Sequence, residues 1–138
     1  MSAPDRGAPA AARRAPFQYA ALRVVPHVER GEAVNAGVVL FCRPLRFLGA
    51  KTQLDEGLLK ALAPDCDPVA VSTLLRTMER IAAGVPDGGP IAQLPQSERF
   101  HWLVAPASTI VQPGPVHTGL TSDPSAELAR VFVRLVER

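Results

Sequence analysis

The stretch Glu-Arg-Gly-Glu-Ala-Val-Asn-Ala-Gly-Val-Val-Leu-Phe-Cys, residues 29–42, decides how this chain folds. From residue 33 onward the stretch is apolar except for Asn35, whereas residues 29–32 are three charged side chains and a glycine. A continuous, valine-rich apolar run is typical of a strand that is covered on both faces of its sheet. The stretch therefore predicts a polar turn that leads into a central strand over residues 33–42, and such a turn can hold a functional site on a rigid base.

The segments on either side of this stretch predict two further strands. Residues 17–25 contain the β-formers Phe, Tyr and Val mixed with polar residues, and Pro26 ends the strand because proline cannot donate to a β-ladder. After Pro44, residues 45–51 predict a short third strand that is joined by a tight connection. The first half of the chain is therefore predicted to be an antiparallel meander.

Three later segments have the period of a helix. An aspartate that can cap the first turn begins each of them, at Asp55, Asp67 and Asp123. Pro64 ends the first helix, and Gly84 ends the second in a left-handed conformation. Apolar stripes predict which side chains face the core: Leu58, Leu59 and Leu62 in the first helix, Val71, Leu74, Leu75, Met78, Ile81 and Ala82 in the second, and Leu128, Val131, Phe132 and Leu135 in the third.

The region between the second and third helices predicts a loop and three short strands. Residues 85–98 are interrupted by prolines and glycines and are predicted to form a long surface loop. Residues 100–104 alternate in the manner of a strand, and residues 109–112 and 116–120 predict two more strands, separated by the rigid turn Pro113-Gly114-Pro115. The element order predicts an α+β domain, with a mainly antiparallel sheet of about five to six strands and two to three helices on one face.

The composition indicates a soluble globular protein. The 138 residues are 47% hydrophobic and 20% charged, and no apolar run approaches the roughly 20 residues that span a bilayer. Two cysteines are too few for a disulfide framework, and the N-terminus has no apolar signal segment, so we expect a cytoplasmic location. Residues 1–16, rich in Ala, Pro and Arg, predict a disordered tail, and residues 17–138 predict a single domain.

The distribution of charge argues against nucleic acid as a partner, and the lack of a long apolar run argues against a membrane. Three arginines against one aspartate in residues 1–16 account for the whole net charge of +2, so the predicted domain is formally neutral. Binding to a phosphate backbone needs a concentrated cationic surface. We therefore expect no membrane contact and no nucleic-acid binding, and the oligomeric state is left open.

Three blocks of the sequence together resemble a known bacterial family. They are Glu-Ala-Val-Asn-Ala-Gly-Val at residues 32–38, Arg-Phe-His-Trp-Leu-Val-Ala-Pro at residues 99–106, and Val-His-Thr-Gly-Leu at residues 116–120. In this order they resemble the domain-of-unknown-function family numbered 3037, and the resemblance covers essentially residues 17–138. The resemblance implies no activity. It does imply a kinase-like protein similar to the HipA toxins as a neighbour in the genome, and hence as a candidate partner.

The first candidate site comprises Glu29, Arg30, Glu32 and Asn35. Two carboxylates beside a turn could bind a hard cation or act as an acid and a base. Alternatively, Arg30 neutralises one of the glutamates, and Asn35 hydrogen-bonds the backbone. A polar side chain in an apolar strand that lacks a partner costs about 1–3 kcal/mol, so Asn35 is expected either to brace the turn or to face a ligand.

Two further sets of residues are candidates. His27, His101 and His117 could complete a metal site if the strands bring them together, but no short motif of paired ligands supports it, and we expect no metal. Arg99 and Trp102, together with Phe17, Arg43 and Arg46, could form a face that stacks bases and binds phosphate. The alternative is that Trp102 and Phe100 anchor the core and the arginines lie at strand edges.

The sequence contains no complete catalytic set, and it predicts no cofactor. We therefore expect a non-enzymatic protein-interaction or regulatory module that partners a HipA-like kinase. The alternative is a small metal-dependent hydrolase or nuclease-like enzyme that uses Glu29, Glu32 and a histidine, so whether the protein is an enzyme is left open. The predicted binding residues are Glu29, Arg30, Glu32, Asn35, Arg99, Trp102 and His117.

Overall fold

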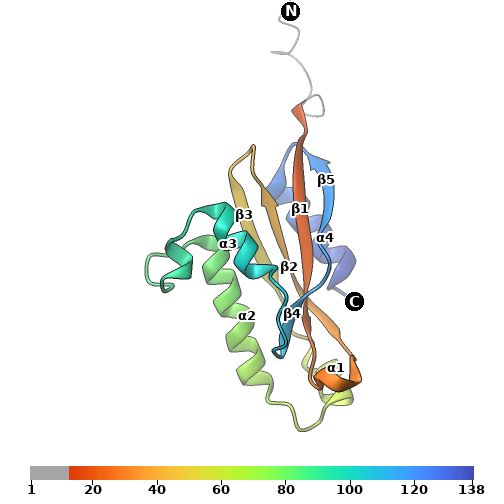
Figure 1. The fold of residues 1–138 in the computed structure, drawn as a ribbon. Helices are drawn as coiled ribbons and strands as arrows, with labels where there is room; N and C mark the ends of the chain where they lie inside the picture. Colours follow the sequence, from red (N-terminus) through yellow and green to blue (C-terminus); the bar gives the residue numbers. More distant parts are fainter. Residues whose placement is uncertain (1–12) are drawn as a thin grey trace, which may run out of the picture.

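The computed structural model describes residues 13–138, which form a five-stranded antiparallel sheet and four α-helices (Figure 1). The α+β class that the sequence predicts is confirmed. The strands are β1 (Ala15–Val24), β2 (Val34–Cys42), β3 (Phe47–Thr52), β4 (Val111–Pro113) and β5 (His117–Thr121). The helices are α1 (Glu56–Leu62), α2 (Pro68–Ala83), α3 (Gln96–Leu103) and α4 (Pro124–Leu135), with short 3-10 turns η2 (Val28–Arg30) and η3 (Ile91–Gln93).

The first strand, β1, lies inside the sheet and has three partners. The sheet order is β3-β2-β1-β4, and β5 also pairs with β1. On one edge β1 pairs with β2, and on the other edge its first half pairs with β5 and its end pairs with β4. Between these two short strands, the amide of Gly114 donates to the Ala21 carbonyl at 2.8 Å. The segment after α3 therefore completes the sheet.

A register shift in the β1–β2 pair changes which face Asn35 occupies. Leu22 pairs with Gly37, but the next residue, Arg23, pairs with Asn35, so Ala36 is an extra residue on β2. Ala36 is fully buried in the same core cluster as Leu22. A bulge of this kind reverses the alternation of side chains along the strand. Asn35 therefore lies on the opposite face of the sheet, on the same face as Arg23.

The sheet is packed on both faces, by different helices. On the first face the aliphatic residues of β1 and β2 pack against α2 and α3, and the fully buried members include Leu22, Val24, Val39, Val71 and Phe100. On the second face α4 packs over β2 and β3, and the buried members include Phe17, Val38, Leu40, Val131 and Phe132.

The two packed faces correct one expectation and confirm another. The expectation that the helices lie on one face holds for α2 and α3, but α4 covers the opposite face. The prediction that both faces of the strand at residues 33–42 are covered is confirmed, because β2 contributes to both clusters. A doubly buried strand requires a second helical layer, and α4 supplies it.

The strand predicted at residues 100–104 is wrong, since these residues lie in and just after α3, which runs from Gln96 to Leu103. The helix follows Pro95, and its first turn consists of Gln, Ser and Glu. Phe100 and Leu103, three residues apart, are buried, as expected for one face of a helix. A pattern of five residues fits both a strand and one face of a helix. The polar residues before it belong to the first turn and favour the helix. The predicted loop at residues 85–98 is correspondingly shorter and contains η3.

The other predicted helices are confirmed with their caps. The side chains of Asp55, Asp67 and Asp123 accept from the amides of Leu58, Val69 and Ala126, and Gly84 ends α2 with a φ of 66°. Residues 1–12 of the predicted tail lie outside the described residues, and β1 already begins at Ala15. Among residues 13–138 no helix combines the length and the apolar character needed to cross a membrane.

Candidate functional site

The turn between β1 and β2 contains the first candidate set, and an ion pair accounts for two of its members. Nε and Nη2 of Arg30 donate to Oε1 and Oε2 of Glu32 at 3.0 and 3.3 Å, a bidentate arrangement. The hydrogen bond and the charge of Arg30 lower the pKa of Glu32. Gly31 closes the turn with a φ of 72°, which is the conformation that favours glycine. Glu29 is exposed on this turn. The ion pair and the glycine therefore account for these residues as parts of the turn, without a ligand.

The three histidines lie in three different places. Nε2 of His27 is 3.8 Å from Oδ1 of Asp65, before α2. The ring of His117, on β5, lies 5.3 Å from the ring of Tyr19. His101 is exposed on α3. In residues 13–138 no three His, Cys, Asp or Glu side chains come together as metal ligands would. The cluster on which the hydrolase alternative depends is not assembled in this part of the chain.

Asn35 has a partner far along the sequence. Its Nδ2 donates to the carbonyl of Leu135 at 3.1 Å, and so satisfies one of the carbonyls that the end of α4 leaves without an intrahelical partner. The bond attaches the last turn of the C-terminal helix to β2. Asn35 therefore braces the second face of the sheet rather than the turn, and its side chain also lines a cavity there.

Arg99 and Trp102 have separate roles, although both belong to α3. Nη1 of Arg99 donates to the Leu94 carbonyl at 2.7 Å, and its guanidinium lies against Gly84, so Arg99 joins the end of α2 to α3. Trp102 is 46% exposed and is not a core anchor, whereas Phe100 is fully buried. Of the two, Trp102 is exposed and Arg99 is half-buried.

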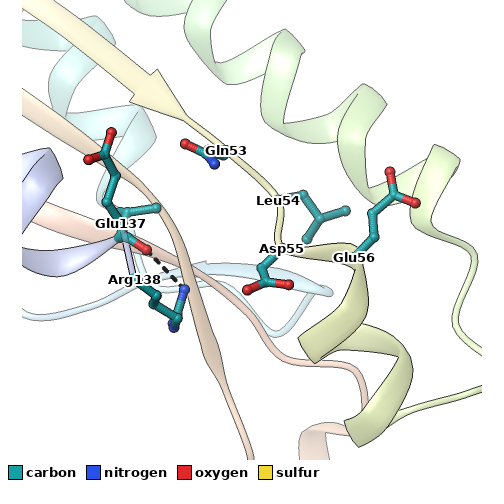
Figure 2. A pocket seen from close by; sticks show the side chains of 7 residues that line it. Gln53, Leu54, Asp55, Glu56, Glu137 and Arg138 are labelled. Atoms are coloured by element: carbon teal, nitrogen blue, oxygen red, sulfur yellow. Dashed lines mark hydrogen bonds between the residues drawn. The ribbon is translucent and has the colours of Figure 1, made fainter.

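A wide cavity of about 560 Å³ lies between the end of β3 and the residues after α4 (Figure 2). Glu137 and Arg138 stand on one side of it, and residues 53–56 stand on the other. Asp55 is occupied in capping α1, and Nη1 of Arg138 donates to the Val136 carbonyl at 2.9 Å. Two of its charged groups therefore serve local structure, and the lining does not define a ligand.

A smaller cavity of about 250 Å³ lies on the second face of the sheet, beside the end of α4; we call it the Arg23 cavity. It brings together two predicted binding residues, Asn35 and His117, with two residues that were not predicted, Tyr19 and Arg23. Its complete lining is Tyr19, Ala21, Arg23, Asn35, Gly114, Pro115, His117 and Leu135. Tyr19 and Arg23 occupy alternate, half-buried positions of β1, and that alternation is the sequence signal that could have identified them.

Fold and cavities together define a small α+β domain, with helices on both faces of an antiparallel sheet and a polar cavity where one face is left open. Over residues 19–136 the chain matches the model of the family described as "Protein of unknown function (DUF3037)", and it belongs to that family. The resemblance seen in the sequence is thus confirmed. No curated protein and no solved structure matches the chain.

Proposed function

We propose that the protein is a non-enzymatic module that binds a protein partner, and that the partner is a kinase-like protein similar to the HipA toxins. The observation that supports the proposal is a half-exposed tryptophan beside an apolar depression. Tryptophan is the residue type most enriched at the energetic centres of protein interfaces. The family resemblance supports the choice of partner.

The depression, which we call the Trp102 groove, has a volume of about 230 Å³. It lies where α2 and α3 meet the segment that leads into β4. Its lining is almost entirely apolar: Met78, Trp102, Leu103, Ala105, Pro106, Ala107, Val111 and Pro113. An apolar side chain of a partner could enter this groove and cover the indole of Trp102.

The apolar surface continues beyond the groove along α2. Leu74 lies one helical turn before Met78 and is 41% exposed, although the sequence predicts that it faces the core. Single exposed apolar residues are ordinary, but Leu74 lies on the same side of α2 as Met78, and Met78 lines the groove together with Trp102. An apolar area of this kind is typical of a docking surface.

No specific observation favours the hydrolase alternative. Glu32 is paired with Arg30, and Cys42 is completely buried. Burial raises the pKa of the Cys66 thiol, and the charges of Asp65 and Asp67 raise it further, which disfavours the nucleophilic thiolate. These groups therefore support a structural role rather than catalysis.

The test is direct binding between the purified chain and a purified kinase-like protein similar to the HipA toxins, measured by isothermal titration calorimetry. Trp102→Ala is expected to weaken binding by at least about tenfold, the loss typical of a central interface residue. Val133→Ala is the matched control, since Val133 is 54% exposed on α4, which packs on the other face of the sheet. It should leave the affinity unchanged.

Two outcomes would overturn the proposal. One is the absence of binding between the two unmodified proteins at concentrations where a Kd of about 10 μM is readily measured. The other is equal weakening by Trp102→Ala and Val133→Ala, which would show that the groove is not the docking surface. Circular dichroism of each variant establishes that a loss of binding is not a loss of fold.

A further inference from the structure

We infer that the Arg23 cavity binds a small organic anion, whose carboxylate or phosphate group pairs with the Arg23 guanidinium and whose body lies against Tyr19 and His117. The inference concerns the second face of the sheet and does not depend on partner binding at the Trp102 groove. It rests on the state of Arg23, on the backbone that holds its guanidinium, and on the other groups that line the cavity.

Arg23 differs from the other arginines of the described chain in being half-buried without an internal acceptor. Arg30, Arg80 and Arg130 each have a carboxylate within 3.0 Å, and Arg99 donates to a backbone carbonyl. Within residues 13–138 Arg23 makes no hydrogen bond and no ion pair. A half-buried arginine whose guanidinium has no internal acceptor is suited to bind a carboxylate or phosphate bidentately.

The turn before β5 holds the guanidinium in place. A Cβ atom at Gly114 would lie 2.9 Å from Nη2 and 3.0 Å from Nε of Arg23, so only glycine leaves room for the side chain as it stands. The same glycine donates its amide to the Ala21 carbonyl, which attaches the turn to β1. The guanidinium therefore lies directly against the backbone of this turn, which restricts its positions and lowers the entropy lost when a ligand binds.

The bulge at Ala36 adds a second polar group to the cavity. It places Asn35 beside Arg23 on the second face rather than in the aliphatic core. One N–H of the Asn35 amide is taken by the Leu135 carbonyl, and the amide has a further N–H and a carbonyl oxygen that can bind a ligand. The bond also occupies the Leu135 carbonyl, one of the acceptors that the end of α4 leaves without an intrahelical partner.

The remaining lining determines what kind of anion fits. The rings of Tyr19 and His117 lie 5.3 Å apart with 34° between their planes, and form an aromatic wall. Among residues 13–138 no aspartate or glutamate lines this cavity, in contrast to the wide cavity, which is lined by Asp55, Glu56 and Glu137. The volume of about 250 Å³ accommodates a small ligand. The cavity therefore favours a compact anion with a flat, apolar body.

The test is a two-dimensional NMR titration of the full chain with benzoate, phenyl phosphate and inorganic phosphate, each to about 10 mM. We expect saturable shifts of the Asn35 side-chain amide, the Gly114 amide and the Arg23 Nε–H with benzoate or phenyl phosphate. Benzoate and phenyl phosphate distinguish a carboxylate from a phosphate ligand. Arg23→Gln should weaken the binding by at least about tenfold.

Gly114→Ala gives an independent test, because it keeps the positive charge but displaces the guanidinium. The side chain of Arg23 can move, and Gly114 does not have a positive φ, so this variant should fold. It should also bind more weakly. Arg43→Gln, at an exposed arginine beyond β2, is the control and should bind as the unmodified chain does.

Three results would overturn the inference. The first is the absence of saturable shifts with all three probes. The second is equal binding by the unmodified chain and by Arg23→Gln. The third is binding of inorganic phosphate as tight as that of phenyl phosphate, which would remove the role assigned to Tyr19 and His117.

Discussion

The two faces of the sheet are covered to different extents. On the first face, α2 and α3 close over β1 and β2, and the β1 residues Ala20, Leu22 and Val24 have no exposed surface. On the second face, α4 covers β2 and β3, and the β1 residues Tyr19, Ala21 and Arg23 remain half-exposed beside it. The hydrophobic pattern of each strand therefore follows from its burial. β2 is covered on both faces and is apolar throughout, whereas β1 is covered less completely on the second face and alternates. The Arg23 cavity lies beside the end of α4, where this helix no longer covers β1.

The largest effect on stability is expected from a substitution that creates a cavity in the first face of the sheet, which α2 and α3 cover. Phe100→Ala removes a completely buried ring that lies 5.2 Å from the ring of Phe41, and should lower the free energy of unfolding by about 3–5 kcal/mol. Trp102→Ala, two residues later on the same helix, should cost about 1 kcal/mol or less because its ring is half-exposed. Urea denaturation measures both. Equal losses would show that the two sides of α3 are not differently packed.

The second largest effect is expected where α2, on the first face, is hydrogen-bonded to the edge strand β3. Oε2 of Glu79 on α2 accepts from both the amide and the hydroxyl of Thr52, at 2.8 and 2.7 Å. Hydrogen bonds to a charged group contribute about 1.5–3 kcal/mol, so Glu79→Ala should destabilise the fold by about 2 kcal/mol. Glu98→Ala, at an exposed glutamate on α3, is the control and should change the stability by less than about 0.5 kcal/mol.

A smaller effect on stability is expected on the second face, which α4 covers only in part. Asn35→Ala removes the donor to the Leu135 carbonyl, and should cost about 1 kcal/mol. The loss should be local: hydrogen exchange should accelerate at the Val136 amide, which donates to Phe132, and remain unchanged in α2. Gln18→Ala, at an exposed position of β1, serves as the control. Uniform acceleration in both helices would contradict a local role for Asn35.

The smallest effect is expected at the turn, which belongs to neither face. Arg30→Gln should return the pKa of Glu32 to its ordinary range, as measured by a carbon-13 NMR titration of the carboxyl group. The pair lowers this pKa in the folded chain, so its contribution is present above the unfolded pKa and is lost as the pH falls through the folded value. Salt should screen this pair, because both side chains are in contact with solvent. Arg43→Gln, the control, should leave the Glu32 titration unchanged.

Local sequence patterns predicted most of the fold. They failed where a short segment fits both the period of a strand and the period of a helix. The three capping aspartates and the apolar run of β2 each depend on neighbours in the sequence, and the structure confirms them. Residues 100–104 were assigned to a strand because alternation over five residues also fits one helical face. The position of α4 on the second face depends on tertiary packing, although the double burial of β2 already required some cover there.

The candidate site was predicted only in part, because its residues meet through pairings that are distant in sequence. Asn35 stood out as the one polar residue of its run, but its partner Leu135 lies a hundred positions later. His117 was grouped with the other histidines by residue type, whereas its actual neighbour is Tyr19. No pattern in the sequence distinguishes Arg23, because a charged residue in an alternating strand is ordinary. Its distinction is the lack of an acceptor, which only a structure can show.

The position of β1 between β2 and the pair β4 and β5 has a consequence during synthesis of the chain. The ribosome makes β1 first, and β2 and β3 can join it as soon as they emerge. The other edge of β1 must wait for residues 111–121, close to the C-terminus. Until then its N–H and C=O groups are available to other chains, as at any open sheet edge. Between the synthesis of β3 and of β5, β1 therefore has one unpaired edge at which the nascent protein can aggregate.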